Sequence, residues 1–184
     1  MKKVFLVLAV ISLAFTSCSS DDDNDNDIIY PENIYEGSVV LNSPIDIEQF
    51  GLLNYTTITG SLTISDPENE QHITNLDPLI SLTHIDGNLN INNNPHLTDL
   101  SGLNNLTKIG SIAGAGKLYI QNNLSLTHLN GLENLTSSYG TSEISNNESL
   151  VNFCGLINFT SNLTIYDNAY NPTLEDIQNG NCSL

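Results

Sequence analysis

The chain has 184 residues, of which 21 are acidic and only four are lysine or arginine, and its formal net charge at pH 7 is −17. A surface of this charge repels polyanions, so nucleic acid and anionic lipid headgroups are excluded as partners. The residues beyond the first 35 are numerous enough for one domain with a substantial core.

The N-terminus has the pattern of an export signal. Two lysines precede an apolar run over residues 4–15, which is too short to cross a membrane as a stable helix. Small residues and Cys18 follow, an arrangement that resembles a bacterial lipoprotein signal, although Phe15 replaces the leucine usual at that point. The resemblance implies that residues 1–17 are a signal peptide and that Cys18 carries lipid. The alternative is ordinary signal cleavage, with Cys18 incidental.

An acidic segment follows the cysteine. Residues 19–35 contain five aspartates and almost nothing apolar before Ile28. We therefore predict that residues 18–35 form a lipidated cysteine and a disordered tether. The run Ser19–Asp23 resembles the surface-export signal of Bacteroidota lipoproteins, which implies a lipid-anchored protein of the outer membrane, exposed on the cell surface. Without the signal peptide the formal charge is 2 − 21 = −19, so the acyl chains must supply membrane attachment.

A repeated motif begins after the acidic segment. Its clearest copy reads Gly87-Asn-Leu-Asn-Ile-Asn-Asn93, followed by Leu97-Thr-Asp-Leu-Ser-Gly-Leu-Asn-Asn-Leu-Thr107. A last partial copy starts at Leu163, and the others start at glycines 23 to 29 residues apart: Gly37, Gly60, Gly87, Gly116 and Gly140. A period in this range is typical of a solenoid, in which each copy buries its apolar side against its neighbours.

Each copy provides three short apolar edges. The first alternates as a β-strand does, with Leu89 and Ile91 on one side and asparagines on the other. The leucines at 97 and 100 supply a second edge and those at 103 and 106 a third, so we predict three parallel sheets. No segment has a 10-residue amphipathic helical pattern. The predicted fold of residues 36–184 is all-β, a right-handed parallel β-helix (solenoid) of about six coils.

One polar position directly follows each strand of the first edge. If the alternation of the strand continues, its side chain points to the buried side. We predict that its side chains are buried and hydrogen-bonded to backbone groups or to each other, as in an asparagine ladder. The column reads Ser43, Asp66, Asn93, Asn122, Asn146 and Asp167. The alternative is a column of calcium ligands, although the Gly-Gly-x-Gly-x-Asp calcium repeat does not occur in the chain.

The rhythm of the two clearest copies, over residues 87–107 and 116–136, resembles the receptor L-domain family. This family comprises the leucine-rich β-helices of insulin- and EGF-type receptor ectodomains and of many bacterial surface proteins. The resemblance extends over about residues 36–184 and is clearest over 84–165. The segment from Phe153 to Cys182 is similar to the closing segment of Bacteroidota members. The resemblance implies a binding function.

Cys154 and Cys182 are the only cysteines after residue 18. An even pair near one end of an exported domain indicates a disulfide, with two free thiols as the alternative. We expect Leu174 and Ile177 to pack on the preceding copy and Cys182 to return to Cys154. The segment after Tyr170 would then cover the last apolar edge of the stack.

The titratable residues do not indicate catalysis or metal binding. The four histidines, at positions 72, 84, 96 and 128, show no zinc-ligand spacing and are expected in different columns. The column of His128 is expected to be a solvated edge: Gln49, Asn75, Asp99, His128, Asn152 and Asp176. The chain has no nucleophile elbow or phosphate loop, and without arginine it is poorly equipped as a polysaccharide lyase. We predict no enzyme activity, metal or cofactor.

The outward face of the first predicted sheet is the candidate binding surface. It combines neutral hydrogen-bonding groups with two tyrosines and one lysine, which suits sugars or extended peptides. The candidate ligand-binding residues are Lys117, Tyr119, Gln121, Glu143, Ser145 and Tyr166. The alternative interpretation is a merely solvated sheet face.

These features together predict a cell-surface lipoprotein that acts as a non-catalytic binding or adhesion module for a glycan or protein ligand. Two alternatives stay open at this point. One is a structural envelope spacer without a dedicated ligand. The other is an accessory glycan-capture protein of an outer-membrane uptake system.

Overall fold

The computed structural model describes residues 33–184, except residue 67 and residues 112–115. The predicted signal peptide, Cys18 and all but the last three residues of the predicted tether lie outside the described residues. A compact unit spans Pro31–Leu184. It includes Ile34 and Tyr35, which were assigned to the tether but form its first strand.

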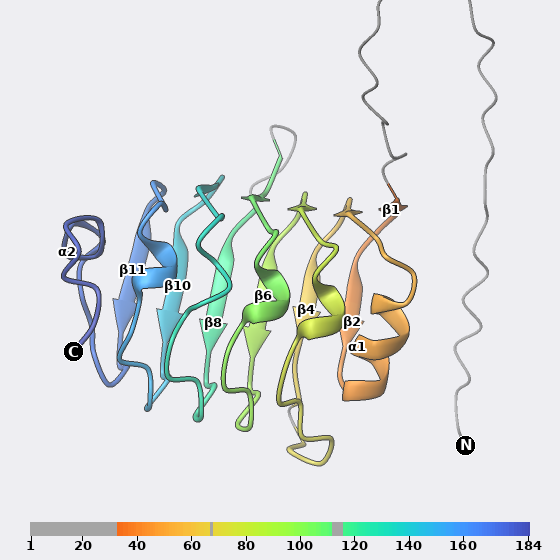
Figure 1. The fold of residues 1–184 in the computed structure, drawn as a ribbon, viewed down its shortest axis with the longest axis horizontal. Helices are drawn as coiled ribbons and strands as arrows, with labels where there is room; N and C mark the ends of the chain where they lie inside the picture. The colour runs from red at the N-terminus through yellow and green to blue at the C-terminus, as the bar shows by residue number, and fades with distance from the viewer. Residues whose placement is uncertain (1–32, 67, 112–115) are drawn as a thin grey trace, which may run out of the picture. The chain divides into compact units, whose positions relative to one another are not determined.

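Two parallel sheets form the described unit. The larger sheet has six strands in the order β11-β10-β8-β6-β4-β2, which lie side by side in Figure 1. Their bounds are β2 (Val39–Leu41), β4 (Leu62–Ile64), β6 (Leu89–Asn92), β8 (Leu118–Gln121), β10 (Ser142–Ser145) and β11 (Leu163–Tyr166). The smaller sheet has five strands of two residues each, in the order of the sequence: β1 (Ile34–Tyr35), β3 (Thr57–Ile58), β5 (His84–Ile85), β7 (Lys108–Ile109) and β9 (Ser137–Ser138).

The register of the larger sheet follows the repeat. Ile64 pairs with Ile91, Ile91 with Ile120, and Ile120 with Ile144, so each copy lies directly beside the next. The alternating strand residues Leu89, Ile91, Leu118 and Ile120 are fully buried. The predicted all-β class and strand alternation are therefore confirmed.

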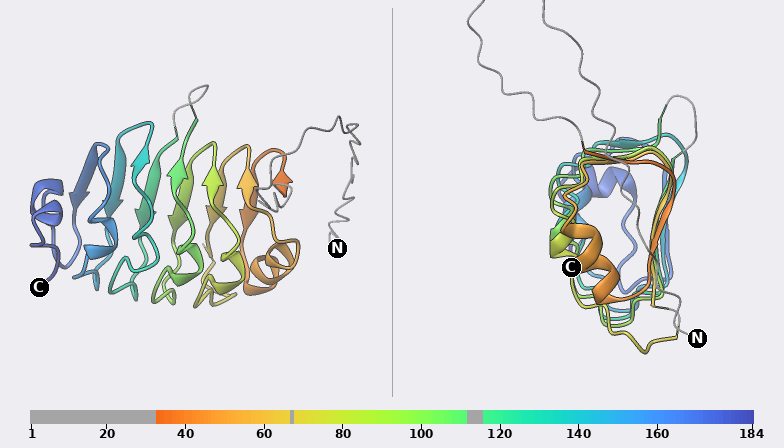
Figure 2. Two further views of the ribbon diagram at one scale, coloured as in Figure 1. Left: turned by 45° about the horizontal axis from the view of Figure 1, so that its top comes forward. Right: turned by 90° about the vertical axis from the view of Figure 1, so that its right-hand side faces the viewer.

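Only the first of the three predicted sheets is confirmed. The second predicted edge, at Leu97 and Leu100, forms no strand, and the strands of the smaller sheet come after the third edge, as β7 does at Lys108–Ile109. Among the described residues, the third edge forms helical turns in four of the copies: α1 (Pro44–Gly51), η1 (Asp77–Leu79), η2 (Ser101–Leu103) and η3 (Cys154–Leu156). The end-on view of Figure 2 shows these turns on the side opposite the larger sheet. The Leu-x-Gly-Leu segment turns too tightly for a strand, and its apolar residues at i and i+3 face the core as 3-10 geometry requires.

Glycine allows these turns to stack closely. A Cβ atom on Gly102 would lie 1.7 Å from the carbonyl oxygen of Leu76 in the preceding copy, and one on Gly155 would lie 1.9 Å from that of Leu129. No side chain fits such a gap. The glycine of the Gly-Leu motif thus fixes the spacing of the third edge.

The predicted asparagine column is displaced by one residue. Four of its members, Asn93, Asn122, Asn146 and Asp167, are exposed and have φ between 54° and 59°. The buried side chains belong to the next residue in each copy: Asn94, Asn123, Asn147 and Asn168. A left-handed residue ends the strand alternation, so the following side chain turns into the core. Asn and Asp tolerate this conformation best among residues with a Cβ.

The buried asparagines form a continuous ladder. Asn94 donates through Nδ2 to Oδ1 of Asn123 (3.1 Å), Asn123 to Asn147 (3.1 Å), Asn147 to Asn168 (2.9 Å) and Asn168 to Asn171 (3.0 Å). The backbone N–H groups of the four donor residues reach the same acceptors. N–H donors thus occupy these amide oxygens.

The ladder ends at Asn94, whose Oδ1 is buried without a partner in the described part of the chain. By sequence register the next position is Pro67, which has no amide N–H and no side-chain amide. Asp66 is buried as predicted, but its carboxylate accepts backbone N–H groups of Glu70, Gln71 and His72 instead.

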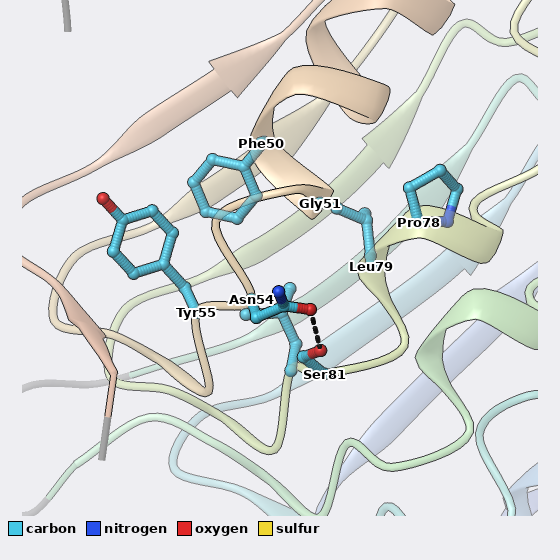
Figure 3. A pocket seen from close by; sticks show the side chains of 8 residues that line it. Phe50, Gly51, Asn54, Tyr55, Pro78, Leu79 and Ser81 are labelled. Carbon is cyan, nitrogen blue, oxygen red and sulfur yellow. Dashed lines mark hydrogen bonds between the residues drawn. The ribbon is translucent and has the colours of Figure 1, made fainter. Parts of the chain in front are cut away.

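The N-terminal end of the described unit carries a helix that the sequence analysis missed. Ser43 caps α1 by accepting the N–H of Asp46 at 3.2 Å, and Pro44 occupies the first turn. These cap signals are present in the sequence. Ile47 and Phe50 are buried, and Phe50 packs with Tyr35 and Tyr55. Figure 3 shows the residues that line a hollow at the end of α1, among them Phe50, Tyr55 and Leu79; this hollow is too small to hold a water molecule.

The C-terminal end is closed as predicted. α2 (Leu174–Gln178) buries Ile177, and Leu174 packs against the core. Cys154 and Cys182 form a disulfide with a Cα–Cα distance of 4.9 Å. Phe153 donates its N–H to the carbonyl of Cys182 at 2.7 Å. The closing segment therefore covers the last apolar edge. No helix in the described part of the chain is long and apolar enough to cross a membrane.

Candidate functional site

The outward face of the larger sheet brings five of the six predicted binding residues into two neighbouring columns, and Lys117 directly precedes β8. Tyr119 and Glu143 are register partners, and so are Glu143 and Thr164. In the next outward column Gln121 pairs with Ser145, and Ser145 pairs with Tyr166. The predicted offset between the two tyrosines, two strands along the sheet and one column across it, is therefore confirmed.

Four of the six predicted residues form one hydrogen-bonded group, which we name the Glu143 cluster: Gln121, Glu143, Ser145 and Tyr166. Oε1 of Glu143 accepts a hydrogen bond from Nε2 of Gln121, one from Oγ of Ser145 at 3.0 Å and one from the hydroxyl of Tyr166 at 2.6 Å. Three adjacent strands, β8, β10 and β11, contribute these groups. The carboxylate is thereby held in one orientation on the sheet.

The cluster shifts the pKa values of its two titratable members in opposite directions. The hydrogen bond from Tyr166 is the main cause that lowers the pKa of Glu143, and those from Ser145 and Gln121 lower it further. Desolvation opposes this shift. The same bond to Glu143 raises the pKa of Tyr166. At neutral pH the cluster therefore presents an ionised carboxylate and a neutral phenol.

The members of the cluster differ in exposure. Tyr166 is 41% exposed, whereas Ser145 is fully buried beneath its neighbours although it belongs to the outward column. Oε2 of Glu143 makes no hydrogen bond within the described residues, so it is free to accept one. The cluster thus combines a fixed acceptor with an exposed aromatic ring.

Lys117 and Tyr119 lie beside the cluster but are not hydrogen-bonded to it through their side chains in the described part of the chain. The aliphatic part of Lys117 packs directly over Gly140. A Cβ atom added to this glycine would lie only 2.8 Å from Cγ of the lysine. Tyr119 is half-buried between its register partners Asn90 and Glu143. The structure therefore places both residues at the border of the cluster.

Asn92 is a polar residue of this face that the sequence analysis did not single out. It is the register partner of Gln121, and its Oδ1 is buried without a hydrogen-bond partner among the described residues. Its place in the outward column was visible in the sequence, but the unpaired oxygen was not. An unpaired buried acceptor is stabilised by a donor from water or a ligand.

A separate hollow of about 490 Å³ lies at the corner that follows the larger sheet. It is lined by Asp66, Asn69, Asn93, Pro95, Asn122 and Leu124. Asn93 and Asn122 face solvent here because of their left-handed backbone. Strict strand alternation predicts these two side chains in the core, so the sequence pattern does not indicate the hollow.

The expectation that the histidines occupy different columns is wrong for one pair. The rings of His72 and His96 meet edge to face, with 4.6 Å between their centroids. The loop over residues 66–72 is longer than its counterpart after Asn93. Because of this difference in length, the sequence repeat does not align His72 with His96. No group of three or more metal-binding side chains occurs within residues 33–66, 68–111 and 116–184.

The side chains of the predicted solvated edge are exposed or half-buried, as predicted, and several of them also have a structural role. Asn75, Asp99 and Asn152 each accept the backbone N–H two residues ahead, at 3.3, 3.0 and 2.9 Å. These Asx turns begin the 3-10 helices of the third edge. The hydrogen bonds from Ser101 are the leading cause that lowers the pKa of Asp99. His128 is the exception in this column, since its buried Nδ1 has no partner in the described residues.

A sequence model of the family described as receptor L domain matches residues 54–163, which is more than half of the chain. The matched range includes Tyr119 and most of the Glu143 cluster, but not Tyr166. No curated protein matches the chain.

Proposed function

Because the chain belongs to the receptor L-domain family, a family of ligand-binding modules, we propose that it binds a glycan or protein ligand through the outward face of its larger sheet. The role is non-catalytic binding or adhesion. The proposal rests on the Glu143 cluster, in which three strands hold one ionised carboxylate beside an exposed tyrosine. Around that carboxylate the face carries mostly neutral polar side chains, with the cation Lys117 at the border.

The chemistry of the cluster defines what it can bind. The free oxygen of Glu143 is an acceptor, so the ligand must present donors such as sugar hydroxyls or peptide N–H groups. The rings of Tyr119 and Tyr166 offer apolar faces for stacking. The net charge of −17 disfavours polyanionic ligands.

We further propose that the domain is a right-handed parallel β-helix of about six coils, presented on the cell surface by a lipid on Cys18. The supports are the parallel register of successive copies and the lipoprotein-like N-terminal sequence. The change Cys18→Ala should abolish incorporation of a labelled fatty acid. Continued labelling of this variant would contradict the anchor, and resistance of the domain to protease added to intact cells would contradict surface exposure.

A second candidate is a structural spacer without a dedicated ligand. The observation that favours it is the mutual satisfaction of the Glu143 cluster, since three donors already occupy Oε1. A solvated sheet face would be stabilised by the same bonds. Under this alternative Tyr166 has no role beyond its hydrogen bond.

Parallel probing of glycan and protein arrays separates the two candidates. The purified chain without its signal peptide is compared with the double variant Tyr119→Ala/Tyr166→Ala and with the control Val40→Ala, which changes the same outward face at its opposite edge. Binding by the chain and the control, but not by the double variant, supports the proposal. Absence of any reproducible ligand favours the spacer, whereas equal binding by all three proteins would place the binding site away from the two tyrosines.

A further inference from the structure

Two imidazole rings from neighbouring copies lie against each other on the surface. His72 and His96 are 24 residues apart in sequence and both side chains are exposed. Their ring centroids are 4.6 Å apart and the rings are inclined by 71°. This distance is close to the spacing of about 4.8 Å between paired strands, so the repeat itself sets the separation of the two rings.

The equivalent position has a different occupant in the later copies. His72 and His96 directly precede the buried residues Ile73 and Leu97, as Ser125 and Ser149 precede Leu126 and Leu150. Each serine hydroxyl bonds to a carbonyl of the preceding copy, Ser125 to Pro95 and Ser149 to Leu124, both at 2.6 Å. The histidines make no such bond among the described residues. Their side chains are therefore not needed for the hydrogen bonds that join successive copies.

The backbone beneath the two rings is fixed. The N–H of His72 donates to Oδ2 of Asp66 at 2.8 Å, and the residue has φ of 55°. The N–H of Leu97, next to His96, donates to the carbonyl of Asn94 at 3.1 Å. Two adjustable imidazoles thus stand on a rigid base, which is a favourable starting geometry for chelation.

We propose that His72 and His96 together bind a divalent transition-metal ion such as zinc, nickel or copper. Imidazole nitrogen is a ligand that these ions prefer, whereas magnesium and calcium prefer oxygen. Two nitrogens on one tetrahedral zinc ion lie about 3.3 Å apart, given bonds of about 2.05 Å. Rings with centres 4.6 Å apart reach this separation when both rotate to direct one edge nitrogen at a shared ion.

The surroundings favour a cation with open coordination positions. The two side chains are exposed, so water can complete the coordination. The loop that carries His72 also contains Glu68 and Glu70, and the chain as a whole is strongly acidic. These charges raise the local concentration of a cation. The proposed site is independent of the Glu143 cluster.

The test is a zinc titration of the purified protein without a histidine tag, followed by NMR of the imidazole nitrogens. The ring signals of His72 and His96 should shift together and those of His84 and His128 should not. The changes His72→Gln and His96→Gln should each weaken zinc binding at least tenfold. His84→Gln and His128→Gln are matched controls that should leave it unchanged.

Three results would overturn the proposal. One is the absence of ring shifts at millimolar zinc. Another is equal zinc affinity in all four variants, which would indicate general attraction to the acidic surface. The third is an equal response to magnesium, which does not select imidazole. Far-ultraviolet circular dichroism of each variant confirms that a loss of binding does not reflect loss of the fold.

Discussion

At the residue scale, two consecutive residues have opposite roles at each corner after the larger sheet. The first, such as Asn122, takes the left-handed backbone conformation and faces solvent. The second, such as Asn123, is buried and donates from Nδ2 to the carbonyl of Ile91 at 2.8 Å and to Oδ1 of Asn147. The Asn-Asn signature is thus a turn former followed by a ladder member.

This division predicts unequal effects of substitution at the two positions. Asn123→Leu should lower the free energy of unfolding by at least about 3 kcal/mol, because it leaves several buried groups unpaired at about 1–3 kcal/mol each. Asn122→Gly should change it by less than about 0.5 kcal/mol, since glycine adopts positive φ freely. Urea unfolding monitored by circular dichroism measures both. Equal losses would contradict the assigned ladder.

The Glu143 cluster predicts a pH-dependent contribution to stability. The pKa of Glu143 is lower in the folded protein than its ordinary value, chiefly because of Tyr166. Its stabilising contribution is therefore fully present above the ordinary glutamate pKa of about 4.3 and is lost as pH falls through the lower folded value. The change Tyr166→Phe should raise the pKa of Glu143 toward the ordinary value.

The measurement is an NMR titration of the Glu143 carboxyl carbon. Tyr119→Phe is the matched control, because Tyr119 is a register partner of Glu143 whose hydroxyl makes no hydrogen bond to it in the described structure. The control should leave the pKa of Glu143 unchanged. A similar shift in both variants would mean that the hydrogen bond from Tyr166 is not the main cause.

At the element scale, the third edge depends on Asx turns, and one copy lacks this turn. Where the copies on either side have aspartate and asparagine, His128 leaves its Nδ1 without a partner among the described residues. No 3-10 helix forms after it, and Gly131 has φ of 108°. The carboxylate of Glu133 accepts the N–H of Gly131 at 2.8 Å instead. The copy is thus built on a substitute turn.

Restoring the Asx turn should stabilise the protein. His128→Asn is expected to raise the free energy of unfolding by about 0.5–1.5 kcal/mol, the net value of one hydrogen bond. Asn75→Ala removes such a bond from another copy and should lower it by a similar amount. Thermal and urea unfolding of the two variants check the prediction. A loss of stability in His128→Asn would show that the packing of the imidazole contributes more to stability than the hydrogen bond of the restored Asx turn.

The C-terminal element adds a covalent restraint to the last copy. The disulfide joins residues 28 apart in sequence. Closing a loop of this length contributes about 3–4 kcal/mol on the chain-entropy account. Together with the buried Ile177, it stabilises the copy that has no successor.

At the scale of the whole molecule, the strands of the larger sheet were predictable, whereas the two-residue strands of the smaller sheet and the corners were not. Alternation at Leu89 and Ile91 sets both the strand and its buried side, so the register that joins Tyr119, Glu143 and Tyr166 follows from the repeat. The alternation of buried and exposed side chains ends at Asn93. Its left-handed backbone changes the direction of the side chains that follow, up to the next turn. The sequence does not encode where that reversal occurs except through the asparagine itself.

Some contacts between copies could not be predicted from the sequence, for a related reason. The pairing of His72 with His96 depends on the length of one loop, which a fixed-period alignment cannot place. The helix α1 replaces the 3-10 turn found in most other copies. In the sequence, only the cap residues Ser43 and Pro44 indicate this helix. The cluster on the larger sheet was predicted as a surface, but its hydrogen bonds depend on rotamers that the sequence does not specify.

The central claim is that the outward face of the larger sheet binds the ligand. Calorimetric titration of the ligand identified on the arrays tests it most directly. Tyr119→Ala and Tyr166→Ala should each weaken binding by more than about 1 kcal/mol, roughly fivefold in Kd, while the melting temperature stays nearly unchanged. Undiminished affinity in the double variant Tyr119→Ala/Tyr166→Ala would contradict the claim and place the binding site on another face.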